Sequence, residues 1–452
     1  MHLKFYLNLK NLRWISNIRN YLNSWVSDES QSLILIFYNS GWLFFDRLVR
    51  LSLGFFVTAW VVRYLGPSKF GELAYVLSYV AIFQMIAVLG LDGIVVRDIA
   101  NKSKDVSLIL GTTLFLRLCA GIFCLVCAIF GMILINGLSD LSVVLTAIAG
   151  GGLIFQAADT VDLWFQSQSQ NRRTVVVKIS AYMISSGIKI MLILIEAPLF
   201  AFALAVAIDS LIVALGLGIA YRDFRCSSKW MYTSNMARQL LKESWPFMLT
   251  GVSIALYMRI DQILIKEILG DRLLGVYAAV LPLATIWQFI PLTLMTTIAP
   301  MLAQKKNESE AAYWSALEKT FCIFSLLGWA TCLPIAIFSG FLVDAIYGVK
   351  FHVGIATLAI YSFTNIFINL GVAQGVWILN ERRSKIGLYK TLIGVIICII
   401  GNLIFLPILG IIGAAIVAVL SQAISSVFSN IIFSRKIFYL QMKSLGYPFF
   451  RF

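Results

Sequence analysis

The chain has 452 residues, of which 60% are hydrophobic and 13% are charged, with a formal net charge of +14. A typical soluble domain has about 45–50% apolar and about 25% charged residues, so this composition excludes a soluble enzyme or binding domain. Apolar runs of about 20 residues can cross a bilayer as helices, whose backbone polar groups pair internally. The sequence therefore predicts an all-α polytopic membrane protein.

Twelve apolar segments are long enough to span a bilayer, at about 39–62, 70–94, 107–134, 142–165, 175–195, 198–219, 246–265, 275–300, 320–338, 354–378, 391–405 and 414–433. Most of the 36 lysines and arginines lie in alternate connections, beginning with the N-terminal segment. Cytoplasmic loops carry such an excess of positive charge. We therefore expect both termini in the cytoplasm, and we attribute the basicity to topology rather than to nucleic-acid binding.

The predicted organisation is a pair of six-helix bundles. The expected divisions are a cytoplasmic amphipathic segment (1–38), a first bundle (39–220), a cytoplasmic linker (221–243), a second bundle (244–433) and a cytoplasmic tail (434–452). The first segment has apolar residues at helical spacing between basic ones, which is typical of a helix lying on the inner leaflet. A poorly ordered basic tail is the alternative. No cleavable signal peptide is visible.

The first span carries three charged residues. Asp46 and Arg50 are four residues apart and can pair on one helix face, which leaves Arg47 over. Arg47 lies about 12 Å into the span at 1.5 Å per residue. A charge at such depth usually faces a protein-lined or watery cavity. Arg47 and Arg50 are predicted to bind an anionic headgroup there, or else to hold the helix to a neighbouring acid.

Four further charged residues lie in the next spans of the first half. Arg117 and Lys189 are each assigned to a cationic cavity, with a structural ion pair or snorkelling to the interface as the alternative. Asp159 and Asp162 belong to a polar stripe in the fourth span. They can pair with the arginines, exchange a coupling cation, or form only a polar interfacial face.

The middle of the sixth span holds Asp209 without another charge nearby in the sequence. A lone acid at that depth either neutralises one of the arginines or titrates during transport. Both readings stay open from the sequence.

The two halves of the chain resemble each other weakly. Leu65-Gly66 followed by Gly71 matches Leu269-Gly270 followed by Gly275 at an offset of 204 residues. Each half has an even number of helices, so the repeats are parallel and related by an axis along the membrane normal, as in some secondary transporters. This predicts a cargo site in a central cavity between the bundles.

The second half has one deep charge cluster and one uncharged polar seam. Arg259 and Asp261 are two residues apart, so they do not face each other on a helix and need separate partners. We expect Arg259 in the cavity and Asp261 as a counterion or coupling group. Asn365, Asn369 and Gln374 in the tenth span are candidates for glycan contact or for hydrogen bonds between helices.

The sequence shows no hydrolytic or transferase constellation and no nucleotide-binding loop, so neither an enzyme nor direct ATP driving is expected. Cys124 and Cys127 have CxxC spacing, but they lie on an apolar span without a nearby histidine or aspartate. We predict no metal site and no cofactor.

Several segments together resemble the Wzx-type O-antigen and polysaccharide flippases of bacterial inner membranes, over nearly all of the chain. The matching segments are Asn39–Trp42, Trp60–Pro67, Phe70–Gly71, Leu89–Asp92, Val95–Asp98, Arg259–Gln262, Gly275–Tyr277, Trp287, Phe289–Pro291 and Pro300. The wider superfamily also contains the multidrug and toxin extruders.

The resemblance implies two six-helix bundles around a central cationic cavity, and an oligosaccharide unit on undecaprenyl pyrophosphate as the cargo. It implies alternating access in the bacterial inner membrane, coupled to H⁺ or Na⁺, with a polymerase and a chain-length regulator as partners. A drug or cation extruder and a membrane-embedded glycan polymerase are the alternatives. The extruder would need an acid-rich cavity, and the polymerase would need a large periplasmic loop.

Overall fold

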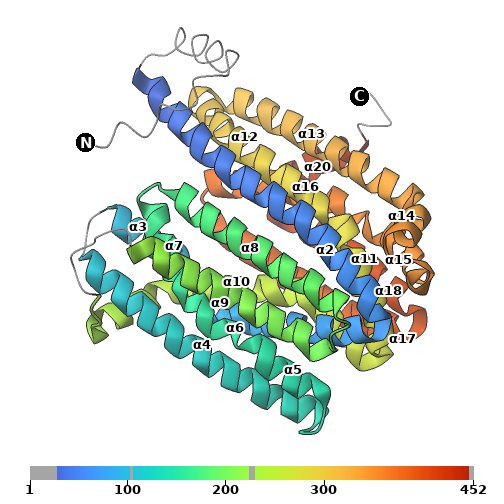
Figure 1. The fold of residues 1–452 in the computed structure, drawn as a ribbon. Coiled ribbons are helices and arrows are strands. Elements are labelled where there is room, and N and C mark those ends of the chain that lie inside the picture. The colour runs from blue at the N-terminus through green and yellow to red at the C-terminus, as the bar shows by residue number, and fades with distance from the viewer. Residues whose placement is uncertain (1–27, 102–104, 223–229, 447–452) are drawn as a thin grey trace, which may run out of the picture.

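The computed structural model describes residues 28–101, 105–222 and 230–446, without the side chains of residues 28–52, 297 and 384. Throughout these ranges the regular elements are helices, which confirms the predicted all-α class (Figure 1). Residues 1–27, part of the expected linker (223–229) and the end of the expected tail (447–452) lie outside the description. The amphipathic helix expected within 1–38 therefore stays a prediction.

The first half forms one lobe, the N-lobe. Its elements are α2 (Asp28–Ala87), α3 (Asp92–Ala100), α4 (Val106–Asn136), α5 (Leu141–Gly150), α6 (Gly152–Phe155), η2 (Gln156–Ala158), α7 (Asp159–Ser167), α8 (Asn171–Leu194) and α9 (Leu199–Arg222). The segment α5–α7 is the predicted fourth span. The helix is interrupted at Gly151. At the next residue, Gly152, a Cβ atom would lie 2.9 Å from the Ser210 hydroxyl of α9, so the two helices approach closely there.

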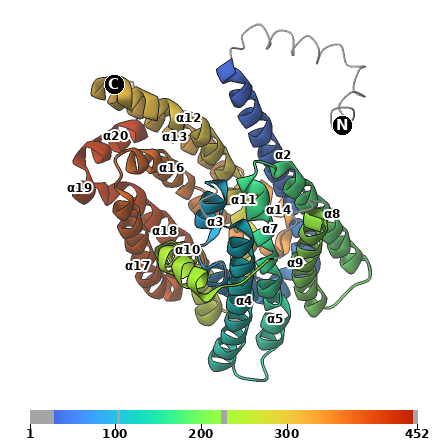
Figure 2. The ribbon, with the colours of Figure 1, turned by 90° about the vertical axis from the view of Figure 1, so that its left-hand side faces the viewer.

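The second half forms the C-lobe. Its elements are α10 (Ser234–Leu269), α11 (Asp271–Thr285), η3 (Ile286–Gln288), α12 (Phe289–Glu308), α13 (Glu310–Ile337), α14 (Ser339–Ile346), η4 (Val349–Phe351), α15 (Gly354–Tyr361), α16 (Thr364–Asn380), α17 (Ser384–Leu409), α18 (Ile411–Ala423), the π-helical turn η5 (Ile424–Phe428), α19 (Asn430–Phe433) and α20 (Arg435–Gly446). Viewed along the bundle, the C-lobe helices, yellow to red, gather opposite the cyan and green N-lobe helices (Figure 2).

The long helix α2 contains two membrane crossings. Its 60 residues would extend about 90 Å as one helix, three times the bilayer core. Gly66 breaks it with a positive φ of 70° and a ψ of 174°. Eleven described segments are long and apolar enough to cross a membrane, and the first of them, Leu53–Ala100, contains this break. Each of the twelve predicted spans therefore corresponds to helix.

The bundle has two distinct ends. We call one the glycine-turn end, because glycines with positive φ make most of its turns, at Gly66, Gly137, Gly270, Gly348 and Gly410. We call the other the basic end; among the described residues it holds the connections around 88–91, 168–170, 230–233 and 381–383. The two ends differ in how the lobes meet there.

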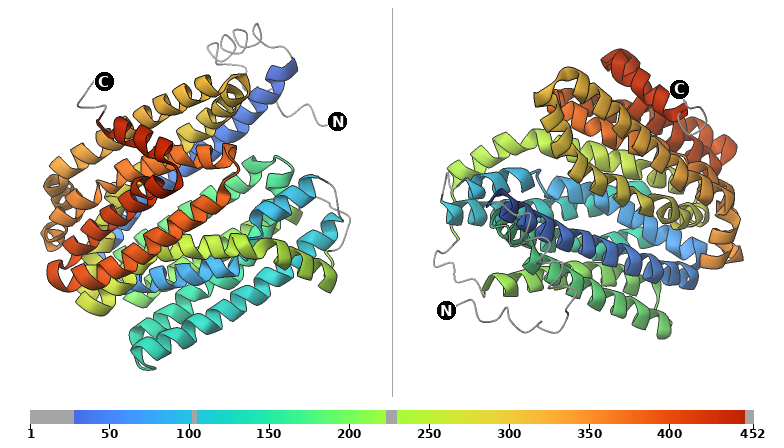
Figure 3. Two further views of the ribbon diagram at one scale, coloured as in Figure 1. Left: turned by 180° about the vertical axis from the view of Figure 1, so that it is seen from behind. Right: turned by 90° about the horizontal axis from the view of Figure 1, so that it is seen from above.

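The buried apolar side chains form one shared core at the glycine-turn end and two separate cores at the basic end. The shared core joins Val62, Tyr75 and neighbours of the N-lobe to Leu274, Tyr277 and neighbours of the C-lobe. The separate cores are centred on Phe321 in the C-lobe and on N-lobe residues with the start of α10. The lobes therefore share one apolar core at the glycine-turn end, whereas at the basic end the C-lobe core is separate and the start of α10 packs with the N-lobe core. Figure 3 gives both lobes from behind and from above.

The two repeat motifs meet face to face in this shared core, the seal between the lobes. A Cβ on Gly71 would lie 1.8 Å from the Asp271 carbonyl oxygen, and a Cβ on Gly275 would lie 1.8 Å from the Pro67 carbonyl oxygen. Gly66 and Gly270, which begin the two turns, share nearly the same backbone angles. The reciprocal contact confirms the pseudo-symmetry predicted from the 204-residue offset.

Candidate functional site

The seam between the lobes continues from the paired glycines as a column of polar contacts. The Ser78 hydroxyl of α2 donates to the Gln262 amide oxygen of α10 at 2.6 Å, and both side chains are buried. One turn closer to the glycine-turn end, the Tyr75 hydroxyl donates to Glu267 at 2.9 Å. These bonds fix which face of α10 meets the N-lobe.

Arg259 lies on that same face of α10, three residues before Gln262 and seven before Lys266. Residues three, four and seven apart share a helix face. The Lys266 ammonium lies 5.6 Å from the centre of the Tyr75 ring of α2, so the face points toward the N-lobe. Arg259 is exposed. It lies on the basic-end side of the Ser78–Gln262 contact, within electrostatic range of Asp261 and Tyr361 of the C-lobe.

The Asp261 side chain points into the C-lobe. Its carboxylate is buried and accepts hydrogen bonds from the Tyr277 hydroxyl at 2.6 Å and from the Gln262 backbone N–H at 2.8 Å. It borders a small polar cavity of about 80 Å³ in the C-lobe, shared with Tyr257 and Gln422. The Asp261 carboxylate thus has hydrogen-bond partners of its own, and Arg259 lies within electrostatic range of it.

The N-lobe contains a larger cavity, of about 390 Å³, between α2, α5, α6, η2, α7, α8 and α9. Its polar lining includes Gln84, Gln156, Asp159, Lys178, Tyr182, Asp209 and Ser210. Apolar side chains such as Leu77, Val80 and Val213 make up the rest. Carboxylates beside apolar walls are screened less than in bulk water, although the Asp159 side chain is 36% exposed.

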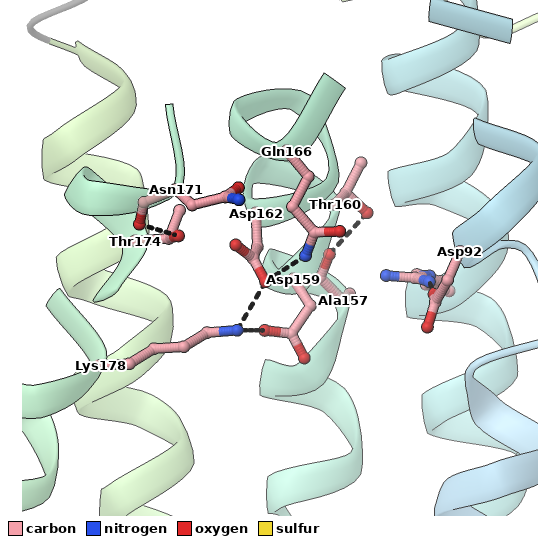
Figure 4. A network of polar contacts seen from close by, with 10 residues as sticks. Asp92, Ala157, Asp159, Thr160, Asp162, Gln166, Asn171, Thr174 and Lys178 are labelled. Carbon is pink, nitrogen blue, oxygen red and sulfur yellow. Dashed lines mark hydrogen bonds and ion pairs between the residues drawn. The ribbon is translucent and has the colours of Figure 1, made fainter. Parts of the chain in front are cut away.

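Lys178 of α8 organises the acids of this cavity (Figure 4). Its ammonium lies 2.6 Å from the Asp162 carboxylate and 3.9 Å from the Asp159 carboxylate, and the Gln166 amide also donates to Asp162. The acids of the predicted polar stripe therefore pair with a lysine of the next helix and not with the arginines. Thr160, between them, is bonded to the Ala157 carbonyl.

Arg117 is paired outside this cavity. It is 3% exposed on α4, and it forms an ion pair with Asp92, the exposed first residue of α3. Its Nε atom has no hydrogen-bond partner. Nearby, Arg97 of α3 bridges Asp98 and Glu243 of α10, so the basic ends of the two lobes are also linked by charge.

Lys189 and Asp209 lie within electrostatic range of each other. Asp209 borders the N-lobe cavity, and Lys189 is partly buried on α8, eleven residues beyond Lys178. The structure thus brings Asp159, Asp162 and Asp209 to one lobe. Asp46, Arg47 and Arg50 lie on the described backbone of α2, but their side chains are outside the description.

The candidate glycan-contact residues face neighbouring helices in this conformation. Asn365 donates to the Ala284 carbonyl at 3.0 Å, Asn369 lies beside the Phe324 carbonyl, and Gln374 bonds to Asn430 at 2.7 Å. All three are at most 3% exposed. The alternative of hydrogen bonds between helices is thus realised, and contact with a sugar stays a prediction.

Sequence reasoning missed two lysines, Lys178 and Lys390. Lys178 lies near the start of the predicted fifth span (175–195) but was not grouped with the deep charges, and Lys390 lies one residue before the predicted eleventh span (391–405), although α17 begins at Ser384. The turns at 168–170 and 381–383 are short, so residues at similar distances from a turn become neighbours on antiparallel helices. Gln374 and Lys390 are each eight residues from Arg382, and Asp162 and Lys178 are seven and nine residues from Ser169, so this rule points to both pairs.

Metal binding has no support in the described part of the chain, where no group of three or more potential ligands comes together. The free cysteines lie apart from the charged residues of the N-lobe cavity, and Cys124 is buried in the apolar core.

The described chain forms two helical lobes that share an apolar core at the glycine-turn end, and solved structures with this fold are known. The structure is similar to an inward-facing multidrug resistance MATE family transporter of the MOP superfamily, with a TM-score of 0.69 and 14% identity over 88% of this chain and 96% of that one. It is similar to the lipid II flippase MurJ in an inward closed conformation, with a TM-score of 0.68 and 13% identity over 92% and 93%. The eukaryotic MATE transporter AtDTX14 matches with a TM-score of 0.58 and 16% identity over 92% and 99%.

The sequence places the chain more closely. Residues 36–306 match the family model described as polysaccharide biosynthesis protein, and the chain belongs to that family. Comparison with curated protein sequences finds no match.

Proposed function

We propose that the protein is a flippase that moves undecaprenyl-pyrophosphate-linked oligosaccharide repeat units across the bacterial inner membrane. The units are those of O-antigen or a related surface polysaccharide. Support comes from the polysaccharide biosynthesis family and from the two-lobed fold shared with a lipid II flippase. In this proposal the basic end faces the cytoplasm, so the structure corresponds to a state that is closed to the periplasm.

The observation that carries the proposal is the position of Arg259. It is exposed on α10, on the basic-end side of the Ser78–Gln262 contact, and among the described residues it forms no ion pair within 4 Å. The proposal places its side chain in the cargo path between the lobes. A guanidinium binds phosphate oxygens through several N–H donors at once. Arg47 and Arg50 of the first span, Arg117 and Lys189 complete the proposed set of cationic residues. Arg117 would have to exchange Asp92 for the diphosphate.

Ion coupling is assigned to the acids inside the lobes. Asp159, Asp162 and Asp209 of the N-lobe and Asp261 of the C-lobe are proposed to exchange H⁺ or Na⁺, with Asp46 as a further counterion. The N-lobe cavity supports this, because it holds carboxylates beside the movable ammonium of Lys178. A cation entering beside Asp159 would weaken its interaction with Lys178 and so alter the packing of α7 against α8.

The proposal also covers the lipid tail of the cargo, the orientation of the termini and the partner proteins. The lipid tail stays in the bilayer while the headgroup passes between the lobes, the termini lie in the cytoplasm, and a polymerase and a chain-length regulator receive the product. Asn365, Asn369 and Gln374 would contact sugar only in a conformation that breaks their present hydrogen bonds.

The test is complementation of a deletion strain, read by gel analysis of surface polysaccharide and by analysis of lipid-linked intermediates. Arg259→Gln should lower surface glycan at least about tenfold, because one charge-assisted phosphate contact contributes about 1.5–3 kcal/mol. Arg272→Gln is the matched control, since Arg272 is exposed at the glycine-turn end. It should restore export fully.

Three outcomes would reject the proposal. Normal export by Arg259→Gln at normal abundance would remove the arginine from the cargo path. Single units that reach the outer leaflet of the deletion strain without being joined would favour a polymerase. Unchanged glycan with new drug sensitivity would favour an extruder.

A further inference from the structure

The C-lobe contains a buried lysine that the transport path does not use. Lys390 lies on α17, six residues after its start, and is 6% exposed. Its ammonium donates to the Asn430 amide oxygen at 3.0 Å, to the Ser426 carbonyl at 3.1 Å and to the Gln374 amide oxygen. All three N–H donors of the ammonium are therefore satisfied by uncharged oxygens.

A fourth side chain closes this cage from outside the membrane-spanning helices. Gln441 of the terminal helix α20 accepts from the Asn430 amide at 2.7 Å, and its own amide lies 3.3 Å from the Ser426 carbonyl. Gln374, Asn430 and Gln441 are at most 1% exposed. One ammonium thus connects α16, α17, the last span and α20.

The charge of Lys390 has no carboxylate partner in the described part of the chain. Titratable side chains of the elements packed around the cage have other partners: Tyr257 contacts Ser421 and Gln422, Glu381 pairs with Lys306, Lys443 pairs with Glu318, and Lys436 lies over the Trp314 ring. Burying an ammonium without a counter-charge is unfavourable, and an ionisable residue in a membrane span is by default a functional candidate.

The backbone at the cage departs from a regular helix. Ser426 lies inside the π-helical turn η5, and its carbonyl accepts from three side-chain donors, on Lys390, Asn430 and Gln441. Turns of this kind are frequent at functional sites. This observation is independent of the burial of the lysine.

We propose that Lys390 is a proton-binding site in the C-lobe, and that its proton controls how firmly α20 is held. The amides of the cage carry donors as well as acceptors, so they can satisfy both forms of the lysine. When Lys390 releases its proton to water, the neutral amine keeps two N–H donors and gains a lone pair. An amide must then rotate to donate to that lone pair.

The rotation acts on α20 through shared atoms. If the Gln374 or Asn430 amide turns toward the amine, it no longer presents the same groups to Gln441. The hydrogen bonds that seat α20 are then fewer. The ion pair of Lys443 with Glu318 does not follow the same pH range, because hydrogen bonding to Glu318 raises the pKa of Lys443.

The test measures hydrogen exchange of the α20 peptide by mass spectrometry on the purified full-length protein in nanodiscs, corrected for intrinsic exchange. Its result does not depend on the proposed cargo. Between about pH 6 and about pH 9 the protection of α20 should fall at least tenfold, since one linked proton shifts an equilibrium by up to about tenfold per pH unit. Lys390→Met should abolish this step, and Lys385→Met, an exposed lysine of the same helix, should keep it.

A second variant guards against misfolding. Lys390→Arg stays charged, so α20 should remain protected across the whole range. Protection of wild-type α20 that does not change with pH would overturn the proposal. So would an unchanged step in a folded Lys390→Met protein.

Discussion

The turn between the fourth and fifth spans and the turn between the tenth and eleventh have the same backbone but different charges. In the N-lobe, Ser169 has a φ of 55° and the Trp164 carbonyl accepts from the Gln168 N–H. In the C-lobe, Arg382 has a φ of 54° and the Trp377 carbonyl accepts from the Glu381 N–H. The two turns are the same structure in two repeats.

Each turn is followed by a helix with a lysine near its start, and the two lysines have opposite surroundings. Lys178 has two carboxylates beside it and borders a cavity. Lys390 has only amide and carbonyl oxygens and is sealed by α20. The repeated turn and helix thus place a lysine at a similar position in each lobe. The residues of the preceding helix determine whether a carboxylate lies beside its ammonium.

The largest effect should come from the contact in which the repeats are alike. Gly71→Ala and Gly275→Ala should each destabilise the sealed state by about 3 kcal/mol, because a Cβ would overlap a backbone oxygen of the other lobe and overpacking is poorly relieved there. Both should stop glycan export and open the seam. Labelling of Ser78→Cys with a maleimide, read by mass spectrometry at that site, measures the opening.

The control for this pair is Gly251→Ala, because Gly251 has no atom within 4 Å of an added Cβ. It should leave labelling and export unchanged. Equal effects at Gly71 and Gly275 would confirm that the lobes are equivalent at the seal. Export at the wild-type rate by either alanine variant would show that the glycines do not limit closure.

The second prediction concerns the charged member of the comparison. Asp162→Asn leaves Lys178 with only Asp159, at 3.9 Å. The free energy of unfolding of the protein in detergent, followed by thermal denaturation, should fall by about 2 kcal/mol. This is less than for a fully buried pair because Lys178 is 25% exposed. The double variant with Lys178→Met should regain part of this loss, since it removes the partly buried ammonium and leaves only the partly exposed Asp159 without its partner. A double variant as unstable as the two single variants combined would contradict the coupling.

The fold was predictable because its signals are local. Apolar length gave the spans, and the Leu-Gly turns gave the repeat, since Gly66 and Gly270 adopt backbone angles that favour glycine. The ends of helices were less predictable. Lys390 fell outside the predicted eleventh span because the polar first turns of α17 are helical although their composition is that of a loop, and α8 likewise begins before the predicted fifth span.

The partners of the charged residues were not predictable from spacing along one helix. Asp159 and Asp162 pair across helices with Lys178, and Arg117 pairs with Asp92, which no periodicity connects to it. For Asp261 the spacing said only that Arg259, two residues away, does not face it along the helix, and its hydrogen-bond partner Tyr277 lies on another helix. Contacts between helices depend on rotation about each axis, which the sequence of one helix does not determine.

The variant Gln374→Glu should change stability least, and it tests the comparison between the two lysines most directly. It gives Lys390 the carboxylate that Lys178 has, so the lysine should stay protonated and α20 should stay protected between about pH 6 and about pH 9. Gln239→Glu adds the same charge at an exposed position of α10 and should keep the wild-type pH step. If the step survived in Gln374→Glu, the proton would not reside on Lys390. If it vanished, one residue would have converted the C-lobe site into the electrostatic type of the N-lobe.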